Sequence, residues 1–277
     1  MSADTLSRVG RSLSDALFPK ICYACGSFVR PAEDKTRPSL SDSDLLPLET
    51  AFTHVMRAFL CTDCMADFVP VRPPFCSRCG RPFKSSIDES HLCGDCISRK
   101  KHFSSARACA VYQGVVLKLI HAYKYQGKTA LAEPFGLLLY LAFIRHFAGK
   151  QIDAAVAVPL HYRRLRTRGY NQALLMLRHW PGFAEKNRDG SGLEIAIETD
   201  ALIRRKNTAS QTGLGRRERT KNMKNAFAVK SPQRIAGRNI LLIDDVYTTG
   251  STSEECSRVL ERAGAAEVHI LSLARAM

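Results

Sequence analysis

The sequence lacks any apolar run of about 18 residues, the length that a helix needs to cross a bilayer. Residues 1–19 have scattered apolar side chains instead of the continuous apolar core of a secretion signal. From these two absences we expect a soluble, cytoplasmic protein without a cleaved signal. The length of 277 residues and the hydrophobic content of 45% are enough for one sizeable core and a small satellite domain.

Negative charge and aromatic side chains are both scarce. The chain has 26 Asp and Glu against 41 Lys and Arg, a net charge of +15, and the basic surplus is concentrated in residues 163–168 and 204–224. This surplus predicts a polyanionic partner, which could be a phosphorylated small molecule, nucleic acid or an anionic membrane surface, with a merely solvated basic face as the alternative. Only Tyr162, Tyr170 and Phe227 are interleaved with the basic segments, which is little for a base-stacking track.

The N-terminal segment predicts a short amphipathic helix in residues 1–20. Its apolar residues follow helical spacing up to Pro19, which ends the pattern. Docking of this helix onto the rest of the protein is favoured over peripheral membrane association, because few such helices are membrane-seeking. The Pro- and Ser-rich residues 31–50 then predict a flexible insertion.

Eight of the ten cysteines form four Cys-x-x-Cys pairs, which predict a metal-binding domain in residues 21–100. The pairs are Cys22/Cys25, Cys61/Cys64, Cys76/Cys79 and Cys93/Cys96. Each tight turn aims two thiolates at one ion, and four thiolates with no open position describe a structural zinc site. Disulfides are disfavoured because an intracellular compartment keeps thiols reduced, and an iron–sulfur cluster is the remaining alternative.

The spacing of the pairs favours two zinc ribbons in series. Consecutive pairing joins the first pair with the second and the third with the fourth, but an interleaved cross-brace is also compatible with the spacing. The site formed by the last two pairs is the safer assignment, because only a short segment separates them. Cys109 and Cys256 lie in a predicted strand and a predicted helix, and we assign neither a chemical role.

Beyond about residue 100 the pattern changes to alternating strands and helices, which predicts an α/β domain in residues 101–277 with a parallel sheet. The predicted strands are residues 107–111, 154–158, 240–243 and 268–273. The predicted helices between and around them are residues 115–123, 131–147, 171–179 and 252–263.

The segment 240–252 carries the clearest functional signal. Four apolar residues form a buried strand, Asp244 and Asp245 follow it, and a hydroxyl-rich loop then leads into a helix. The loop residues are Thr248, Thr249, Gly250, Ser251 and Thr252. Amides, hydroxyls and the positive end of a helix suit a phosphate, while paired carboxylates suit ribose hydroxyls and a hydrated magnesium ion. The segment lacks the Gly-Lys-Ser/Thr of a P-loop, so we expect a sugar phosphate as the ligand.

This stretch resembles the motif of type I phosphoribosyltransferases that binds phosphoribosyl diphosphate (PRPP). The whole chain resembles the ComF family of competence-associated proteins, which are also described as amidophosphoribosyltransferase-like. Besides the cysteine pairs and the PRPP motif, the resemblance rests on Val158-Pro159-Leu160, Arg168-Gly-Tyr-Asn-Gln172, Thr208 with Gln211, and Arg219, Asn222 and Asn225-Ala-Phe227. Family membership implies a type I phosphoribosyltransferase fold behind a zinc-ribbon-like domain.

The resemblance also implies roles for particular residues. Asp244, Asp245 and Arg219 are the expected catalytic residues, and the 248–252 loop is expected to hold the 5-phosphate of PRPP. A short loop with Pro159 and Leu160, followed by Arg168, is expected near the pyrophosphate. Residues 204–227 resemble the flexible catalytic loop, whose arginines would neutralise the departing pyrophosphate. The implied reaction is magnesium-dependent transfer of phosphoribosyl to an acceptor that the sequence does not identify.

Two other functions remain open. The family also suggests a factor that binds single-stranded DNA during uptake, together with proteins of the competence machinery. For that function the expected nucleic-acid contacts are Arg163, Arg164, Arg166, Arg216 and Arg217. A regulator that senses PRPP without turnover is the third alternative, because a fold does not fix an activity.

Overall fold

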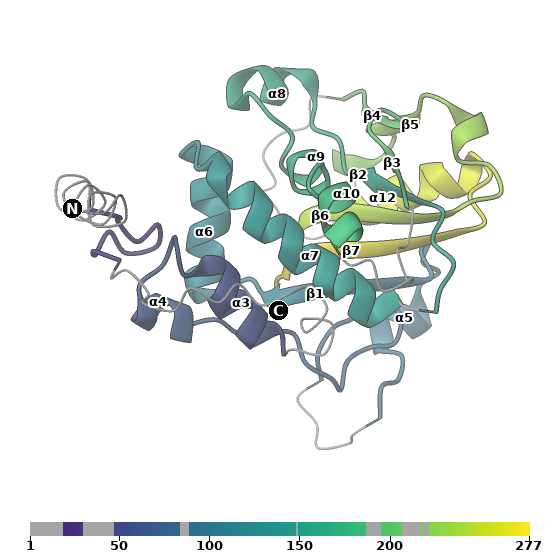
Figure 1. The fold of residues 1–277 in the computed structure, drawn as a ribbon. Coiled ribbons are helices and arrows are strands. Elements are labelled where there is room, and N and C mark those ends of the chain that lie inside the picture. The colour runs from purple at the N-terminus through teal and green to yellow at the C-terminus, as the bar shows by residue number, and fades with distance from the viewer. Residues whose placement is uncertain are drawn as a thin grey trace.

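A computed structural model describes residues 19–29, 47–83, 89–147, 149–186, 195–206, 218 and 222–277. Its centre is a five-stranded sheet in the order β1-β7-β6-β2-β3 (Figure 1). Every pairing in this sheet is parallel. The strands are β1 (Ser105–Val111), β2 (Ala154–Ala157), β3 (Ala196–Glu198), β6 (Asn239–Tyr247) and β7 (Glu267–Arg275). The four predicted strands are confirmed, and β3 is an addition at the edge.

Helices cover both faces of the sheet, because alternate residues of the inner strands are apolar on each side. One face, with Leu241 and Ile243, packs against α6 (Gly114–Tyr125), α7 (Ala132–Phe147), α9 (Gln172–Leu177) and α10 (Trp180–Lys186). The other face, with Ile240 and Leu242, packs against α12 (Ser251–Arg262). The predicted α/β class with flanking helices is therefore confirmed.

Helix α7, with the preceding 3-10 turn η1 (Thr129–Leu131), is apolar on nearly all sides. Within the part of the chain that the structure describes, the stretch Thr129–Phe147 is the one that passes a length and composition test for a membrane span. Of this stretch, 67% is buried inside the protein, which is the environment of a core helix.

The cysteine-rich part contributes three short helices, α3 (Leu48–Met56), α4 (Thr62–Ala66) and α5 (Gly94–Ser98). Phe52 and Met56 of α3 are buried in the same core as α7, so this part packs directly onto the sheet domain. The division of the chain near residue 100 stays a prediction. The predicted N-terminal helix, apart from its last residues, and residues 31–46 of the predicted insertion lie outside the described residues.

The first basic segment is helical, and the ends of the second pair as two short strands. Residues after His161 form the helix α8 (Tyr162–Arg168), because the His161 side chain accepts a hydrogen bond from the Arg163 N–H at its start and Gly169 ends it with a φ of 86°. The ends of the expected catalytic loop pair as an antiparallel ribbon of β4 (Leu202–Arg204) and β5 (Phe227–Val229), followed by the 3-10 turn η2 (Pro232–Arg234). Most of the segment between these two strands is not described.

Candidate functional site

The carboxyl ends of β2 and β6 open into a cavity of about 350 Å³. Elements from distant parts of the sequence supply its walls: the ends of α6 and β2, the helix α8, the strand β4 and the start of α12. This edge is where open α/β sheets bind their ligands. Six side chains matter for the chemistry of the cavity: Lys124, Arg164, Arg168, Arg204, Asp244 and Asp245.

The two carboxylates lie where β6 extends beyond its neighbour β2. The register with β2 ends at Ile243, whereas the register with β7 continues to Tyr247. We expected the acidic pair beyond the strand, but it lies within the strand, on the side that β2 leaves open. The Asp245 N–H donates to Asp244 Oδ1 at 2.9 Å, so the first carboxylate is fixed by its neighbour's backbone.

Lys124, which the sequence analysis did not identify, neutralises one member of the pair. Its Nζ lies 2.6 Å from Asp245 Oδ1, and the two side chains are only 17% and 13% exposed. Burial alone would lower the pKa of Lys124, but Asp245 and then Asp244 outweigh burial and raise it. The lysine is therefore a permanent cation at the floor of the cavity.

Asp244 is the member of the pair whose ionised form the fold disfavours. Burial, and then the charge of Asp245, raise the pKa of Asp244 from 3.8 to about 7, although Lys124 acts in the opposite direction. Near neutral pH this side chain is consequently close to half protonated. An additional cation or hydroxyl donor would stabilise the ionised form of this carboxyl. Carboxyls with a perturbed pKa of this kind are common in functional sites.

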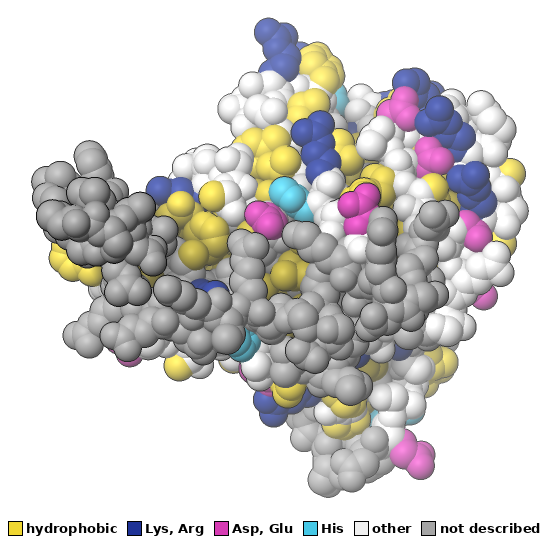
Figure 2. All heavy atoms as spheres, in the orientation of Figure 1, with side chains coloured by type: hydrophobic (Ala, Val, Ile, Leu, Met, Phe, Trp, Pro, Cys, Tyr) yellow, Lys and Arg dark blue, Asp and Glu magenta, His cyan; other side chains and the backbone are white. Residues whose placement is uncertain are grey.

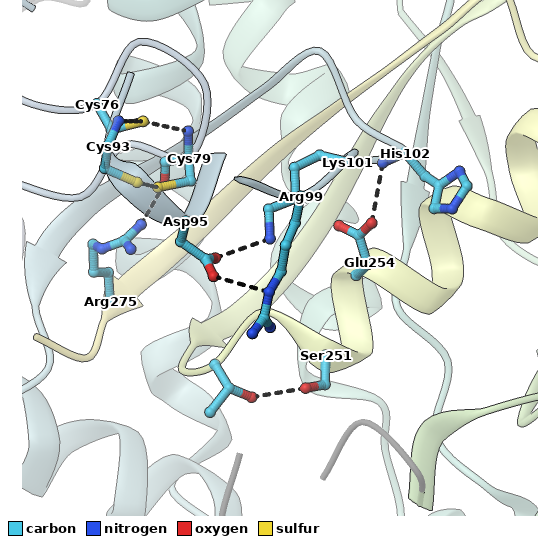
Figure 3. Close-up of polar contacts among 11 residues, drawn as sticks. Cys76, Cys79, Cys93, Asp95, Arg99, Lys101, His102, Ser251, Glu254 and Arg275 are labelled. Carbon is cyan, nitrogen blue, oxygen red and sulfur yellow. Dashed lines mark hydrogen bonds and ion pairs between the residues drawn. The ribbon is translucent and has the colours of Figure 1, made fainter. Parts of the chain in front are cut away.

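The loop after β6 is shaped around Gly250. This residue has a φ of 77°, and an added Cβ would lie 2.4 Å from Tyr247 Oη, so only glycine fits. Three of the predicted loop residues, Thr248, Gly250 and Thr252, line the cavity. Thr249 and Ser251 do not line the cavity, and instead their hydroxyls form a hydrogen bond of 3.0 Å (Figure 3).

The wall opposite the loop is basic. Pro159 and Leu160 line the cavity, and so does Arg168, whose guanidinium carbon lies 5.1 Å from the centroid of the Tyr125 ring. Arg164, which we assigned to nucleic acid, also lines the cavity, whereas Arg163 and Arg166 of the same helix do not. Three further arginines with predicted roles lie outside the described residues: Arg216, Arg217 and Arg219.

Asn171 explains how the exit of β2 is fixed. Its Oδ1 accepts from the N–H of Ala173 at the start of α9, and its Nδ2 donates to the carbonyl of Val158 at 3.0 Å. One side chain thus caps a helix and holds the loop that carries Pro159. The sequence marks Asn171 only as part of the family motif, and neither Lys124 nor the cavity-lining Tyr112 and Tyr125 carry any signal in the sequence.

The eight paired cysteines form two clusters, each with all four sulfur atoms within 4.8 Å of one another. The first holds Cys22, Cys25, Cys61 and Cys64, and the second holds Cys76, Cys79, Cys93 and Cys96. Consecutive pairing is therefore correct and the cross-brace is excluded. Sulfur atoms around one tetrahedral zinc lie about 3.8 Å apart, which matches the 3.6 Å and 3.7 Å found within the two clusters.

The second cluster is buried, and its backbone favours the thiolate form of Cys76, whereas burial raises the pKa of Cys79 and of Cys96. The N–H groups of Cys79 and Cys93 donate to Cys76 Sγ at 3.4 Å and 3.3 Å. Burial alone would raise the pKa of Cys76, but these backbone hydrogen bonds outweigh it and lower the pKa to about 6. A thiolate supported in this way fits a closed, structural zinc site.

Comparison with known proteins agrees with this assignment. A family model described as a double zinc ribbon domain matches residues 53–111, a span that contains three of the four cysteine pairs. The parallel sheet with helices on both faces and the two four-cysteine clusters define the class: an α/β protein with a zinc-ribbon-like N-terminal part.

Relatives then identify the family. The DNA utilization protein YhgH of Escherichia coli (strain K12) is 34% identical over 73% of this chain and 84% of its own length. Competence protein F of Haemophilus influenzae is 31% identical, with coverage of 80% and 93%. Competence protein ComFC of Streptococcus pneumoniae is 31% identical, with coverage of 78% and 87%. The chain belongs to the ComF family.

Among solved structures, the glutamine PRPP amidotransferase from B. subtilis, complexed with ADP and GMP, overlays on 52% of this chain and 26% of its own, with a TM-score of 0.31 and 17% identity. This similarity is too low to support the fold class, which we assign from the strand order and from the helices on both faces of the sheet.

Proposed function

We propose that this protein acts in the cytoplasm as a PRPP-binding phosphoribosyltransferase. One observation supports this proposal most directly: an acidic pair, a hydroxyl-rich loop around Gly250 and four cationic side chains line the same cavity at one edge of the sheet. A ligand for this cavity needs several anionic groups at one end, vicinal hydroxyls in the middle and a phosphate at the other end. PRPP meets all three requirements.

In this arrangement the 5-phosphate of PRPP occupies the loop that contains Thr248 and Gly250. The ribose hydroxyls face Asp244, and the diphosphate faces Arg164 and Arg168 across the cavity. The catalytic contribution of Arg219 remains part of the proposal and rests on the family motif alone.

The donor set also fits a magnesium ion that enters with PRPP, because carboxylate oxygens are its preferred protein ligands. Asp244 and Asp245 would hold it, directly or through water. When bound, magnesium supplies positive charge that both carboxylates and a diphosphate can share. The elevated pKa of Asp244 supports this placement, because a nearby cation would favour its ionised form.

The proposed transfer is a substitution at the anomeric carbon. A nitrogen of the acceptor forms the new bond, the bond to pyrophosphate breaks with its electron pair on the leaving oxygen, and the acceptor's proton passes to solvent. The role of the protein is to position the reactants and to stabilise the charge on pyrophosphate through Arg164, Arg168 and Lys124. Exclusion of water would prevent hydrolysis of the electron-poor sugar.

The test is pyrophosphate release from PRPP with magnesium, measured over a panel of amines and nucleobases. We expect release that depends on both magnesium and one class of acceptor, and that is lost in the Asp244→Ala, Asp245→Ala double variant. Tight PRPP binding without release for any acceptor would support a PRPP-sensing regulator instead. The absence of both PRPP binding and pyrophosphate release would contradict both functions.

A second candidate function, binding of single-stranded DNA, is favoured by the surface of α8. Tyr162 and Leu165 are exposed on this helix among its arginines. Figure 2 shows dark blue and yellow side chains close together at the top of the molecule, where Figure 1 places α8. Stacking groups beside cations are what single strands bind, and the names of the relatives refer to DNA utilization and competence.

For this function the test is a salt titration of oligonucleotide binding. Affinity should fall steeply with salt, and the slope of log affinity against log salt should decrease by about 1.4 when Arg163 and Arg166 are both changed to Gln. These two arginines lie outside the cavity lining, so PRPP affinity should not change. A flat salt response would remove DNA binding as a function of this surface.

A further inference from the structure

The second cysteine cluster and the phosphate loop belong to one hydrophobic core. All four cysteines of this cluster are buried together with Phe103, Tyr247 and Leu260, on the face of the sheet that α12 covers. In the first cluster the buried cysteine is Cys22, which packs into the core on the opposite face. Only one of the two zinc sites therefore lies behind the loop that we assign to the 5-phosphate.

Arg275 connects the second cluster to this core. It lies at the end of β7 opposite Tyr247 and is only 4% exposed. Its Nη1 donates to the carbonyl oxygen of Cys79 at 2.5 Å, and its guanidinium carbon lies 4.9 Å from the centroid of the Tyr247 ring. Figure 3 shows the guanidinium extending from the strand to the cysteine cluster. A zinc ligand is thus joined through one cation to a buried aromatic ring.

Tyr247 transmits this contact to the loop. Its ring is nearly fully buried, with Phe103 packed edge-on at a centroid distance of 6.5 Å. Its hydroxyl lies against the Cα of Gly250, at the point where a side chain would collide. Because Gly250 sets the backbone that starts α12, a displacement of Tyr247 displaces the loop.

A second connection joins the same zinc ribbon to the same helix. Asp95, which lies between two cysteines of the second cluster, forms an ion pair with Lys101 at 3.0 Å. The N–H of the next residue, His102, donates to Glu254 Oε1 in the first turn of α12 at 3.1 Å. Figure 3 shows this path from the cluster to the helix. The start of α12 is therefore linked to the second cluster at two points, at Gly250 through Tyr247 and Arg275, and at Glu254 through His102.

We propose that zinc in the second cluster positions the phosphate loop through Arg275 and Tyr247, so that zinc binding there and PRPP binding are thermodynamically coupled. The inference rests on the proposed function. Arg275 and Tyr247 act as positioning residues, because neither lines the cavity. Coupling of this kind is reciprocal: zinc raises PRPP affinity, and PRPP raises the zinc affinity of this cluster by the same factor. The first cluster is uncoupled.

The chain offers a matched control for Arg275. Arg107 also binds the second zinc ribbon, with its Nη2 donating to the carbonyl of Ser77 at 3.0 Å. Its guanidinium stacks on Phe75, away from Tyr247. Arg107→Met and Arg275→Met therefore remove comparable contacts to one ribbon, but only the second breaks the connection to the loop.

The experiment measures PRPP affinity by calorimetry and zinc retention against increasing chelator. In the wild type, PRPP with magnesium should protect one of the two zinc ions, raising the chelator concentration that removes it by roughly fivefold or more. Arg275→Met should keep both ions, bind PRPP roughly fivefold more weakly and lose the protection. Arg107→Met should retain the affinity and the protection of the wild type. A Cys25→Ser variant, which weakens the first cluster, identifies the protected ion.

The outcomes separate the two levels of the proposal. Equal protection of both ions, protection of neither, or an unchanged PRPP affinity in Arg275→Met would overturn the coupling while the PRPP site stands. Protection of the ion in the first cluster would overturn it as well. A wild-type protein that does not bind PRPP at all would overturn both the coupling and the proposed function.

Discussion

Replacement of Asp244 by asparagine should stabilise the empty protein while it destroys the ligand site. The native pKa of Asp244, about 7, lies above its ordinary value of 3.8, so the folded state retains a proton that the unfolded chain has released. The resulting stabilisation is complete below about pH 4 and is lost as the pH rises through 7. Between about pH 6 and about pH 8 the linkage relation gives a loss on the order of 1 kcal/mol in the free energy of unfolding.

Asp244→Asn has no such titration, so its stability advantage over the wild type should grow by an amount on the order of 1 kcal/mol across that pH range. Urea unfolding of the zinc-loaded protein at several pH values measures this difference. The neighbouring Asp245→Asn variant is the control, because it removes the partner of Lys124 and should destabilise the protein. Parallel stability profiles for the wild type and Asp244→Asn would refute the reasoning. An Asp244→Asn variant that still bound PRPP with magnesium would refute the assignment of the site.

Two further predictions concern the floor and the loop of the cavity. Lys124→Met should lower PRPP affinity by about tenfold, because the diphosphate loses a buried cation. It should also destabilise the ligand-free protein by about 1–3 kcal/mol, because Asp245 is left unpaired. An unchanged PRPP affinity in calorimetry would contradict this prediction. Gly250→Ala should weaken PRPP binding and lower the melting temperature, because a Cβ meets both a positive φ and Tyr247 Oη. Gly264→Ala is the control, because Gly264 also has a positive φ but lies far from the cavity. Its added Cβ would meet Ala236 at 3.4 Å, an ordinary contact distance, so this variant should lower stability without changing PRPP affinity.

Much of this architecture follows from local sequence patterns. The strands at residues 154–157 and 239–247 are continuous apolar runs, and Cys-x-x-Cys turns fix two thiolates at a time whatever surrounds them. The acidic pair and the glycine loop are contiguous in the sequence, so their shared sheet edge could be predicted from one segment. For the same reason the metal clusters and the loop were predicted more accurately than the rest.

The remaining features depend on contacts between distant segments. Lys124 ends an ordinary amphipathic helix, and only the packing of α6 beside β6 places its Nζ against Asp245, 121 residues away. Arg275 lies two residues beyond the predicted strand 268–273 and has no expected role until the fold brings it to Cys79. The choice between consecutive and interleaved cysteine pairing is likewise decided by how the ribbons dock on the sheet. Helix α8 was not predicted because its caps, His161 and Gly169, enclose a segment too short for a periodic pattern.

The central claim is that PRPP binds at the end of β6 through the acidic pair and the loop. The most direct measurement is a calorimetric titration of the zinc-loaded protein with PRPP, with and without magnesium, in the wild type and in the Asp244→Ala, Asp245→Ala double variant. We predict saturable, magnesium-dependent binding of one PRPP per chain in the wild type and none in the double variant, whose fold is retained. Equal binding by both proteins, or no heat from the wild type with magnesium present, would contradict the account.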